Sequence, residues 1–183
     1  MPNYRRARIA GGTYFFTVVT DGRREILTLA RCREALRTAI AETRKLHPFV
    51  AEAWVLLPDH LHCIWTLPVG DEDYSKRWGL IKAGFSKRVR GSFCQQNDSS
   101  NVSKKKHREA SFWQRRFWEH AVRDDEDFRR HVNYIHYNPV KHGLVKRARD
   151  WPYSTFRRFV EDGVYPEDWG GGEAANLADG FGE

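Results

Sequence analysis

Residues 56–66 read Leu-Leu-Pro-Asp-His-Leu-His-Cys-Ile-Trp-Thr, and the fold of this 183-residue chain depends on this stretch. Pro58-Asp59 favours a tight turn between two apolar, β-forming segments, so we expect a β-hairpin here. Because side chains alternate between the two faces of a strand, His60 and His62 share one face. Two neighbouring imidazoles begin a metal site, although a His-x-His pair taken alone is more often the polar rim of a sheet.

The other elements follow from the spacing of apolar residues and from helix signals. Thr28 is a suitable N-cap for the first helix, and Pro139 interferes with the helix that precedes it. The order is β-α-β-β-α-β followed by helices, which predicts an α+β domain. The expected strands are 13–20, 49–57, 60–67 and 117–122, and the expected helices are 28–45, 74–93, 124–138 and 151–160.

Charge is divided unevenly along the chain. The net charge is +7, but seven acidic residues and no Lys or Arg lie in 161–183. Residues 1–160 therefore carry 31 basic against 17 acidic residues, a net charge of +14. A basic body rich in arginine and aromatic residues favours a polyanion, most simply nucleic acid, over an ordinary solvated surface.

Several classes of protein are disfavoured by composition. No apolar run approaches the ~18 residues of a membrane span, and the N-terminus lacks the apolar core of a signal peptide. Cys32, Cys63 and Cys94 are few and widely spaced, which suits a reducing compartment. They provide neither a disulfide framework nor a CxxC zinc knuckle.

Two segments carry basic and aromatic residues suited to DNA. The helix at 74–93 has one packed apolar face and one basic face. Residues 112–120, Phe-Trp-Gln-Arg-Arg-Phe-Trp-Glu-His, interleave rings and guanidinium groups that stack on unpaired bases. An equally good interpretation makes the aromatic residues core and the arginines its rim. The candidates for DNA contact are Lys82, Lys87, Arg88, Arg115, Arg116 and Trp118.

The helix expected at 124–138 presents a further set of polar groups. At about 100° per residue, Tyr134 and Asn138 lie one turn apart on the same side, whereas Tyr137 points roughly opposite the core. A tyrosine hydroxyl can attack a phosphodiester, and an amide oxygen beside two imidazoles can complete a metal site. Without further information, an ordinary helix-surface tyrosine is the simpler interpretation of Tyr134.

The segment around His60-Leu61-His62 resembles the HUH motif of single-tyrosine transposases. More narrowly, it resembles the REP-associated tyrosine transposases, which are domesticated relatives of bacterial insertion-sequence enzymes. The resemblance covers most of residues 3–170. The matching segments are 4–6, 11–17, 113–120, 131–142 and 151–156.

The resemblance implies a ferredoxin-like antiparallel β-sheet with helices packed on one face, built as βαββαβ plus C-terminal helices. It implies that His60 and His62 bind a divalent metal, Mg²⁺ or Mn²⁺, and that Asn138 completes the metal site. Tyr134 is the implied nucleophile. The match at residues 4–6 adds Tyr4, Arg5 and Arg6 to the candidates for DNA contact.

The implied activity is cleavage of single-stranded DNA at REP palindromic hairpins, which leaves a 5′-phosphotyrosine and a free 3′-hydroxyl, followed by rejoining. The alternatives are a protein that binds REP hairpins without turnover and a metal-dependent hydrolase that uses water. We expect a catalytic domain at 1–160 with a flexible loop at 95–110, and an acidic tail at 161–183. We expect a monomer or homodimer in the bacterial cytoplasm, associated with the nucleoid and not with membrane.

Overall fold

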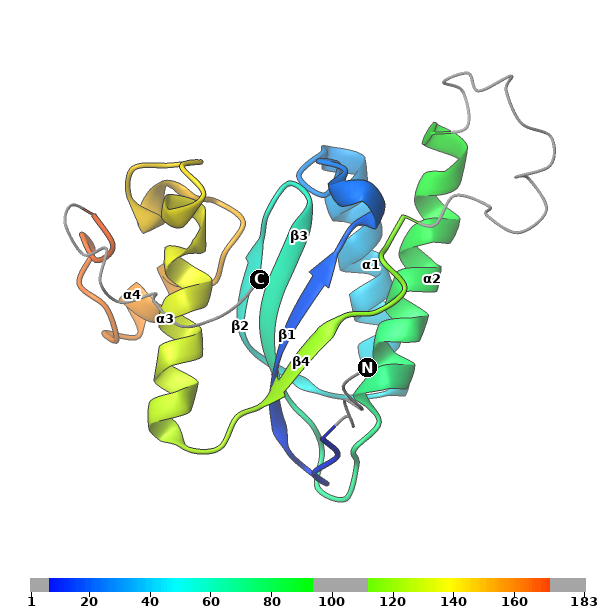
Figure 1. The fold of residues 1–183 in the computed structure, drawn as a ribbon, viewed down its shortest axis with the longest axis horizontal. Coiled ribbons are helices and arrows are strands. Elements are labelled where there is room, and N and C mark those ends of the chain that lie inside the picture. The colour runs from blue at the N-terminus through cyan, green and yellow to red at the C-terminus, as the bar shows by residue number, and fades with distance from the viewer. Residues whose placement is uncertain (1–6, 94–111, 172–183) are drawn as a thin grey trace, which may run out of the picture.

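The computed structural model describes residues 7–93 and 112–171 of the chain. Its centre is a four-stranded antiparallel sheet in the order β2-β3-β1-β4 (Figure 1). The strands are β1 (Thr13–Val19), β2 (Val50–Leu56), β3 (His60–Thr66) and β4 (Trp118–Ala121). The helices are α1 (Ala30–Leu46), α2 (Tyr74–Phe93), α3 (Asp125–Lys141) and α4 (Phe156–Glu161), with 3-10 turns at Asp21–Arg23 and Ala148–Asp150.

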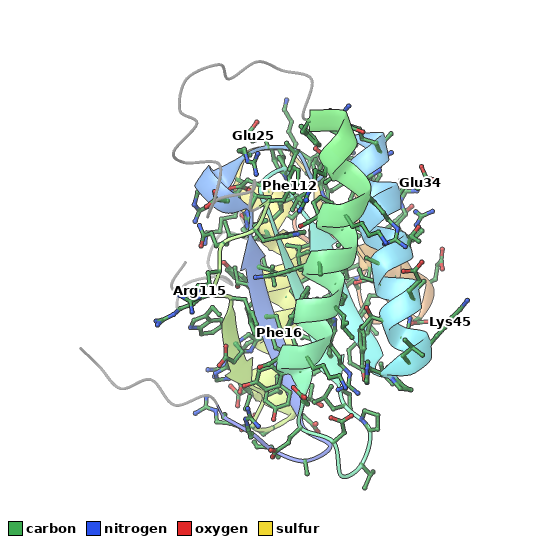
Figure 2. The ribbon with its side chains drawn as sticks, turned by 90° about the vertical axis from the view of Figure 1, so that its right-hand side faces the viewer. Phe16, Glu25, Glu34, Lys45, Phe112 and Arg115 are labelled. Atoms are coloured by element: carbon green, nitrogen blue, oxygen red, sulfur yellow. The ribbon has the colours of Figure 1, made fainter. Side chains whose placement is uncertain are left out.

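Helices cover both faces of the sheet. α1 and α2 lie together on one face, and α3 lies on the other (Figure 1). Tyr14 and Phe16 of β1 enter the core under α1 and α2, whereas Phe15 packs on the α3 side. Figure 2 shows Phe16 between β1 and α2, and Glu34 projecting away from α1. The predicted α+β, ferredoxin-like fold is confirmed: the two helices of the βαββαβ unit share one face, and α3, which follows the unit, covers the opposite face.

β3 lies inside the sheet, between β2 and β1. In its pairing with β1, Thr17 lies opposite His62 and Val19 opposite His60. Neighbouring strands and both helix layers exclude water, so every residue of β3 except Thr66 is buried. The predicted alternation is present, because Leu61, Cys63 and Trp65 join the core under α1 and α2 while Ile64 joins the core under α3.

Two predicted helix ends are wrong. Leu29, and not Thr28, is the N-cap of α1, and no side chain caps this end. α3 passes through Pro139 and ends at Lys141. A proline this close to the end removes only one helical hydrogen bond, and the amides of His142 and Leu144 close the end by donating to the carbonyls of Asn138 and Pro139.

The segment after α3 returns to the free edge of the sheet. Leu56 N donates to Tyr153 O and Thr155 N donates to Trp54 O, so residues 153–155 pair with β2. The helix predicted at 151–160 therefore begins only at Phe156. Its aromatic residues, together with Tyr165, pack in the core that contains α3. The chain beyond α4 is thus docked on α3 as far as Trp169.

Among the helices in the described ranges, none is long and apolar enough to cross a membrane. The loop predicted at 95–110, the end of the acidic tail and the DNA-contact candidates Tyr4, Arg5 and Arg6 lie outside the described residues.

Candidate active site

His60 and His62 lie side by side on the face of β3 that α3 covers, with ring centroids 4.8 Å apart. Asp59 Oδ1 lies 2.6 Å from His60 Nδ1, and Thr17 Oγ1 lies 2.9 Å from His62 Nδ1. A carboxylate that accepts the Nδ1 proton leaves the lone pair of His60 on Nε2. Both rings are therefore held in place by bonds on one nitrogen, which is how proteins orient imidazole ligands of a metal.

His62 is almost completely inaccessible to solvent, at 1% exposure. Burial, with a smaller contribution from neighbouring cationic groups, holds the pKa of His62 well below its usual range. The imidazole is therefore neutral at physiological pH, as a metal ligand must be. Its Nε2 atom is buried and makes no hydrogen bond to any described residue.

α3 brings a tyrosine to this pair of histidines. The Tyr134 ring lies 5.1 Å from the His62 ring, and the His142 ring lies 5.3 Å from the His60 ring. Asn138 lies on the same side of α3, one turn after Tyr134 and one turn before His142. The periodicity of the helix therefore turns Asn138 towards the two histidines.

Asn138 has the surroundings of a metal ligand. Its side chain is 0% exposed, and neither Oδ1 nor Nδ2 makes a hydrogen bond to any described residue. Leaving a buried polar group without a partner destabilises a protein by about 1–3 kcal/mol. A cation bound to Oδ1 would satisfy the acceptor, so His60, His62 and Asn138 fit a divalent metal. The nitrogen-rich set suits Mn²⁺ better than Mg²⁺.

Aromatic and cationic groups surround Tyr134. The Phe15 ring lies 6.0 Å from the Tyr134 ring and 5.4 Å from that of His62. Lys141 places its ammonium group 5.0 Å from the centre of the Tyr134 ring. Beside His60, a cavity of about 190 Å³ opens between the 57–60 turn and the end of α3. It is lined by Arg23, Glu25, Leu57, Pro58, Asp59, His60, His142 and Leu144.

The neighbours of Tyr134 on α3 point elsewhere. Tyr137 packs against Trp169, with ring centroids 6.4 Å apart. His136 is buried on another side of α3, where its Nε2 lies 2.9 Å from Thr155 Oγ1. Of these two tyrosines, only Tyr134 makes a ring contact with His62 among the described residues.

The DNA-contact candidates are spread over two sides of the sheet. Trp118 is 41% exposed on β4, and its ring lies 5.6 Å from Phe15, on the same face as the site. Lys82, Lys87 and Arg88 come from α2, on the opposite face. Arg88 is paired with Glu42 of α1. Arg115 and Arg116 are exposed in the segment before β4, and Figure 2 shows Arg115 projecting outwards.

Sequence reasoning missed a second histidine cluster. His120 Nε2 lies 2.8 Å from Asp127 Oδ2, and the rings of His120 and His131 stack with centroids 4.7 Å apart. Burial raises the pKa of Asp127, but hydrogen bonds from His120 and Arg123 outweigh it and hold this pKa at about 2. Asp127 and His131 lie four residues apart on a helix, a spacing that places them on one side and could have indicated the cluster. The approach of His120 from β4 was not visible in the sequence.

Comparisons with known proteins agree with this geometry. Residues 9–138 match the family described as "Transposase IS200 like". The REP-associated tyrosine transposase of Escherichia coli (strain K12) is 48% identical over 171 residues, which cover 93% of this chain and 92% of the relative. A Haemophilus influenzae relative is 44% identical over 171 residues, covering 93% of this chain and 94% of its own length.

A solved structure extends the comparison to three dimensions. It is described as the REP-associated tyrosine transposase bound to a REP hairpin, and it is 45% identical to this chain. The match has a TM-score of 0.79 and covers 99% of this chain and 95% of the other. The chain therefore belongs to the IS200-like transposases and, among them, to the REP-associated tyrosine transposases, which are enzymes that cleave and transfer DNA strands.

Proposed function

We propose that the chain cleaves and rejoins single-stranded DNA at REP hairpins, with Tyr134 as the nucleophile and a divalent metal held by His60, His62 and Asn138. The observation that carries the proposal is the contact between the Tyr134 and His62 rings at 5.1 Å. Asn138, one turn further along α3, supports it because its buried amide has no other hydrogen-bond partner among the described residues.

The chain's own residues prepare the metal site. Asp59 and Thr17 fix the rings of His60 and His62 through their Nδ1 atoms, so that the Nε2 atoms are available as ligands. When bound, the divalent ion polarises the scissile phosphate and neutralises part of its charge. Either Mn²⁺ or Mg²⁺ would supply this chemistry if held by His60, His62 and Asn138.

Tyr134 supplies the covalent chemistry. Its hydroxyl oxygen attacks the phosphorus and loses its proton, while the bond between phosphorus and the 3′ oxygen breaks and that oxygen takes up a proton. The products are a 5′-phosphotyrosine and a free 3′-hydroxyl, and attack by a 3′-hydroxyl reverses the step. Lys141, close to the Tyr134 ring, provides positive charge where the phenolate and the phosphate carry negative charge.

The partner we propose is a REP hairpin with an unpaired flank. The solved relative is described as bound to a REP hairpin, and residues 1–160 of this chain carry a net charge of +14. Trp118 is exposed beside the site and offers a ring on which an unpaired base can stack. The site's four proposed residues come from one chain, and we propose that a single protomer is sufficient for cleavage.

A hairpin oligonucleotide with a labelled flank tests the proposal. In Mn²⁺, we expect a covalent protein–DNA adduct that survives denaturing electrophoresis, that disappears with chelator, and that is absent in Tyr134→Phe. Tyr137→Phe is the matched control and should retain the adduct. Tight binding of the hairpin by the wild-type protein without any cleavage would instead favour a binding protein, and cleavage without an adduct would favour hydrolysis by water.

A further inference from the structure

Three potential metal ligands lie together between β4 and α3, outside the proposed active site. His120 comes from β4, and Asp127 and His131 come from successive turns of α3. One ligand atom from each residue lies within 4.8 Å of the other two. In the part of the chain that the structure describes, no other three His, Cys, Asp or Glu residues are grouped in this way.

We propose that His120, Asp127 and His131 form a second metal site, which binds Zn²⁺ and joins β4 to the helix that carries Tyr134. Two imidazole nitrogens and one carboxylate oxygen form a ligand set that Zn²⁺ accepts readily, with water in the fourth position. Mg²⁺ prefers oxygen ligands and is disfavoured here. The proposal concerns metal binding alone and does not depend on the proposed DNA cleavage.

The distances between the ligand atoms are close to those of a zinc site. Asp127 Oδ2 is 2.8 Å from His120 Nε2, and Asp127 Oδ1 is 3.2 Å from His131 Nδ1. In a tetrahedral site with bonds of about 2.0–2.1 Å, ligand atoms are about 3.3 Å apart. The Asp127 carboxylate is therefore already at about ligand spacing from each histidine. The ligand atoms of the two histidines lie within 4.8 Å of each other and would have to approach by up to about 1.5 Å when the ion enters. Binding through His120 Nε2 requires the tautomer that carries its proton on Nδ1.

The surroundings provide both rigidity and access. His131 is 0% exposed. Its Nδ1 donates to the backbone carbonyl of Asp127 at 2.8 Å, so binding the ion through Nδ1 requires the proton to move to Nε2 and this hydrogen bond to open. The side chain of His120 is 27% exposed, which opens a path from solvent. The Arg123 guanidinium also contacts Asp127 Oδ2, but this side chain is 73% exposed and can turn into solvent when a cation enters. The backbone N–H of Arg123 remains as a donor that orients the carboxylate.

Phe15 separates this cluster from the HUH histidines. Its ring lies 4.7 Å from His131 and 5.4 Å from His62. An apolar ring between the two groups keeps their ligand sets distinct, so each is expected to bind its own ion. An ion at the second site would fix the first part of α3 to the short strand β4. Its ligand on α3 nearest to the proposed nucleophile, His131, lies three residues before Tyr134.

The test uses the full-length chain with the first site disabled by His60→Gln and His62→Gln. Zn²⁺ binding is measured by calorimetry, and Co²⁺ binding by visible absorption. We expect one ion per chain. His120→Ala and His131→Gln, each added to this background, should weaken Zn²⁺ binding at least ~10-fold. His47→Ala removes a histidine from the turn after α1 and serves as the matched control, with unchanged affinity.

Wild-type protein provides a second measurement in case the background variant does not fold. It should bind two Zn²⁺ ions per chain, and the partly exposed position of His120 makes His120→Ala a mild change that should leave one. Absence of saturable Zn²⁺ binding in the background variant, or a number of ions bound by wild-type protein that His120→Ala leaves unchanged, would overturn the proposal. So would binding that is insensitive to His120→Ala and His131→Gln, or that falls equally with His47→Ala.

Discussion

Replacing Asn138 with leucine should separate the stability of the chain from its activity. Asn138 is fully buried, and its Oδ1 and Nδ2 atoms have no hydrogen-bond partner among the described residues. An unpartnered buried polar group destabilises the folded state by about 1–3 kcal/mol, whereas an apolar side chain of similar shape does not. We therefore expect Asn138→Leu to raise the free energy of unfolding of the metal-free protein by about 1–3 kcal/mol.

Binding of Mn²⁺ should make wild-type protein the more stable of the two. An ion present at 100 times its dissociation constant stabilises a protein that it binds only when folded by about 2.7 kcal/mol. Wild-type protein, with all three ligands, should gain this stability in Mn²⁺, and Asn138→Leu should gain much less. Adduct formation on a hairpin substrate should fall at least ~10-fold in the variant at limiting Mn²⁺, because the ion is bound more weakly.

Urea unfolding followed by tryptophan fluorescence, in chelator and in Mn²⁺, measures both effects. Asn133→Leu is the matched control on the same helix, because Asn133 Oδ1 accepts a hydrogen bond from Tyr165 at 2.5 Å. The control should lose stability in both conditions and respond normally to Mn²⁺. If Asn138→Leu lost as much stability in chelator as Asn133→Leu, or gained as much from Mn²⁺ as wild-type protein, our account of the third ligand would be refuted.

Three further predictions concern other side chains. Asp59→Asn should weaken Mn²⁺ binding ~10–100-fold, because the amide orients His60 less well than the carboxylate; calorimetry showing unchanged affinity would contradict this role. Arg77→Met should lower the free energy of unfolding by ~2–4 kcal/mol, since Arg77 is 2% exposed and its removal takes the guanidinium donor away from Asp71 Oδ2 and from the carbonyls of His47 and Pro48; a loss below ~1 kcal/mol in urea unfolding would show that the pair is dispensable. Burial lowers the pKa of His136 to about 3, so between pH 6.5 and this value the unfolded chain binds one more proton than the folded chain. Stability should therefore fall by up to ~1.4 kcal/mol per pH unit below pH 6.5, and His136→Gln should remove one proton's share of that slope; an identical slope in the variant would exclude His136 as its source.

Simple periodicity was enough to predict the parts of the site that lie within single elements. The alternation of a strand put His60 and His62 on one face, and the turn of a helix put Tyr134 and Asn138 on one side. The resemblance to a known family then predicted that the two histidines of the strand and the two residues of the helix form one site. The structure places the Tyr134 ring against His62, which local pattern alone could not establish.

Features that depend on tertiary contacts were not predictable. Residues 153–155 pair with the edge of β2, and this pairing overrides the local preference for a helix beginning at Trp151. α3 continues past Pro139 because the amides of His142 and Leu144 close its end. His120 meets Asp127 only because the turn after β4 brings the start of α3 back against the sheet, a geometry that no short sequence window contains.

Locating the covalent bond to DNA tests the central claim most directly. Trypsin should release residues 131–141 as one peptide, which contains both Tyr134 and Tyr137. Fragmentation of this peptide by mass spectrometry, after reaction with a REP hairpin in Mn²⁺ and nuclease digestion, identifies the modified residue. We predict a nucleotide on Tyr134; a nucleotide on Tyr137, or cleaved DNA with neither tyrosine modified, would contradict the account.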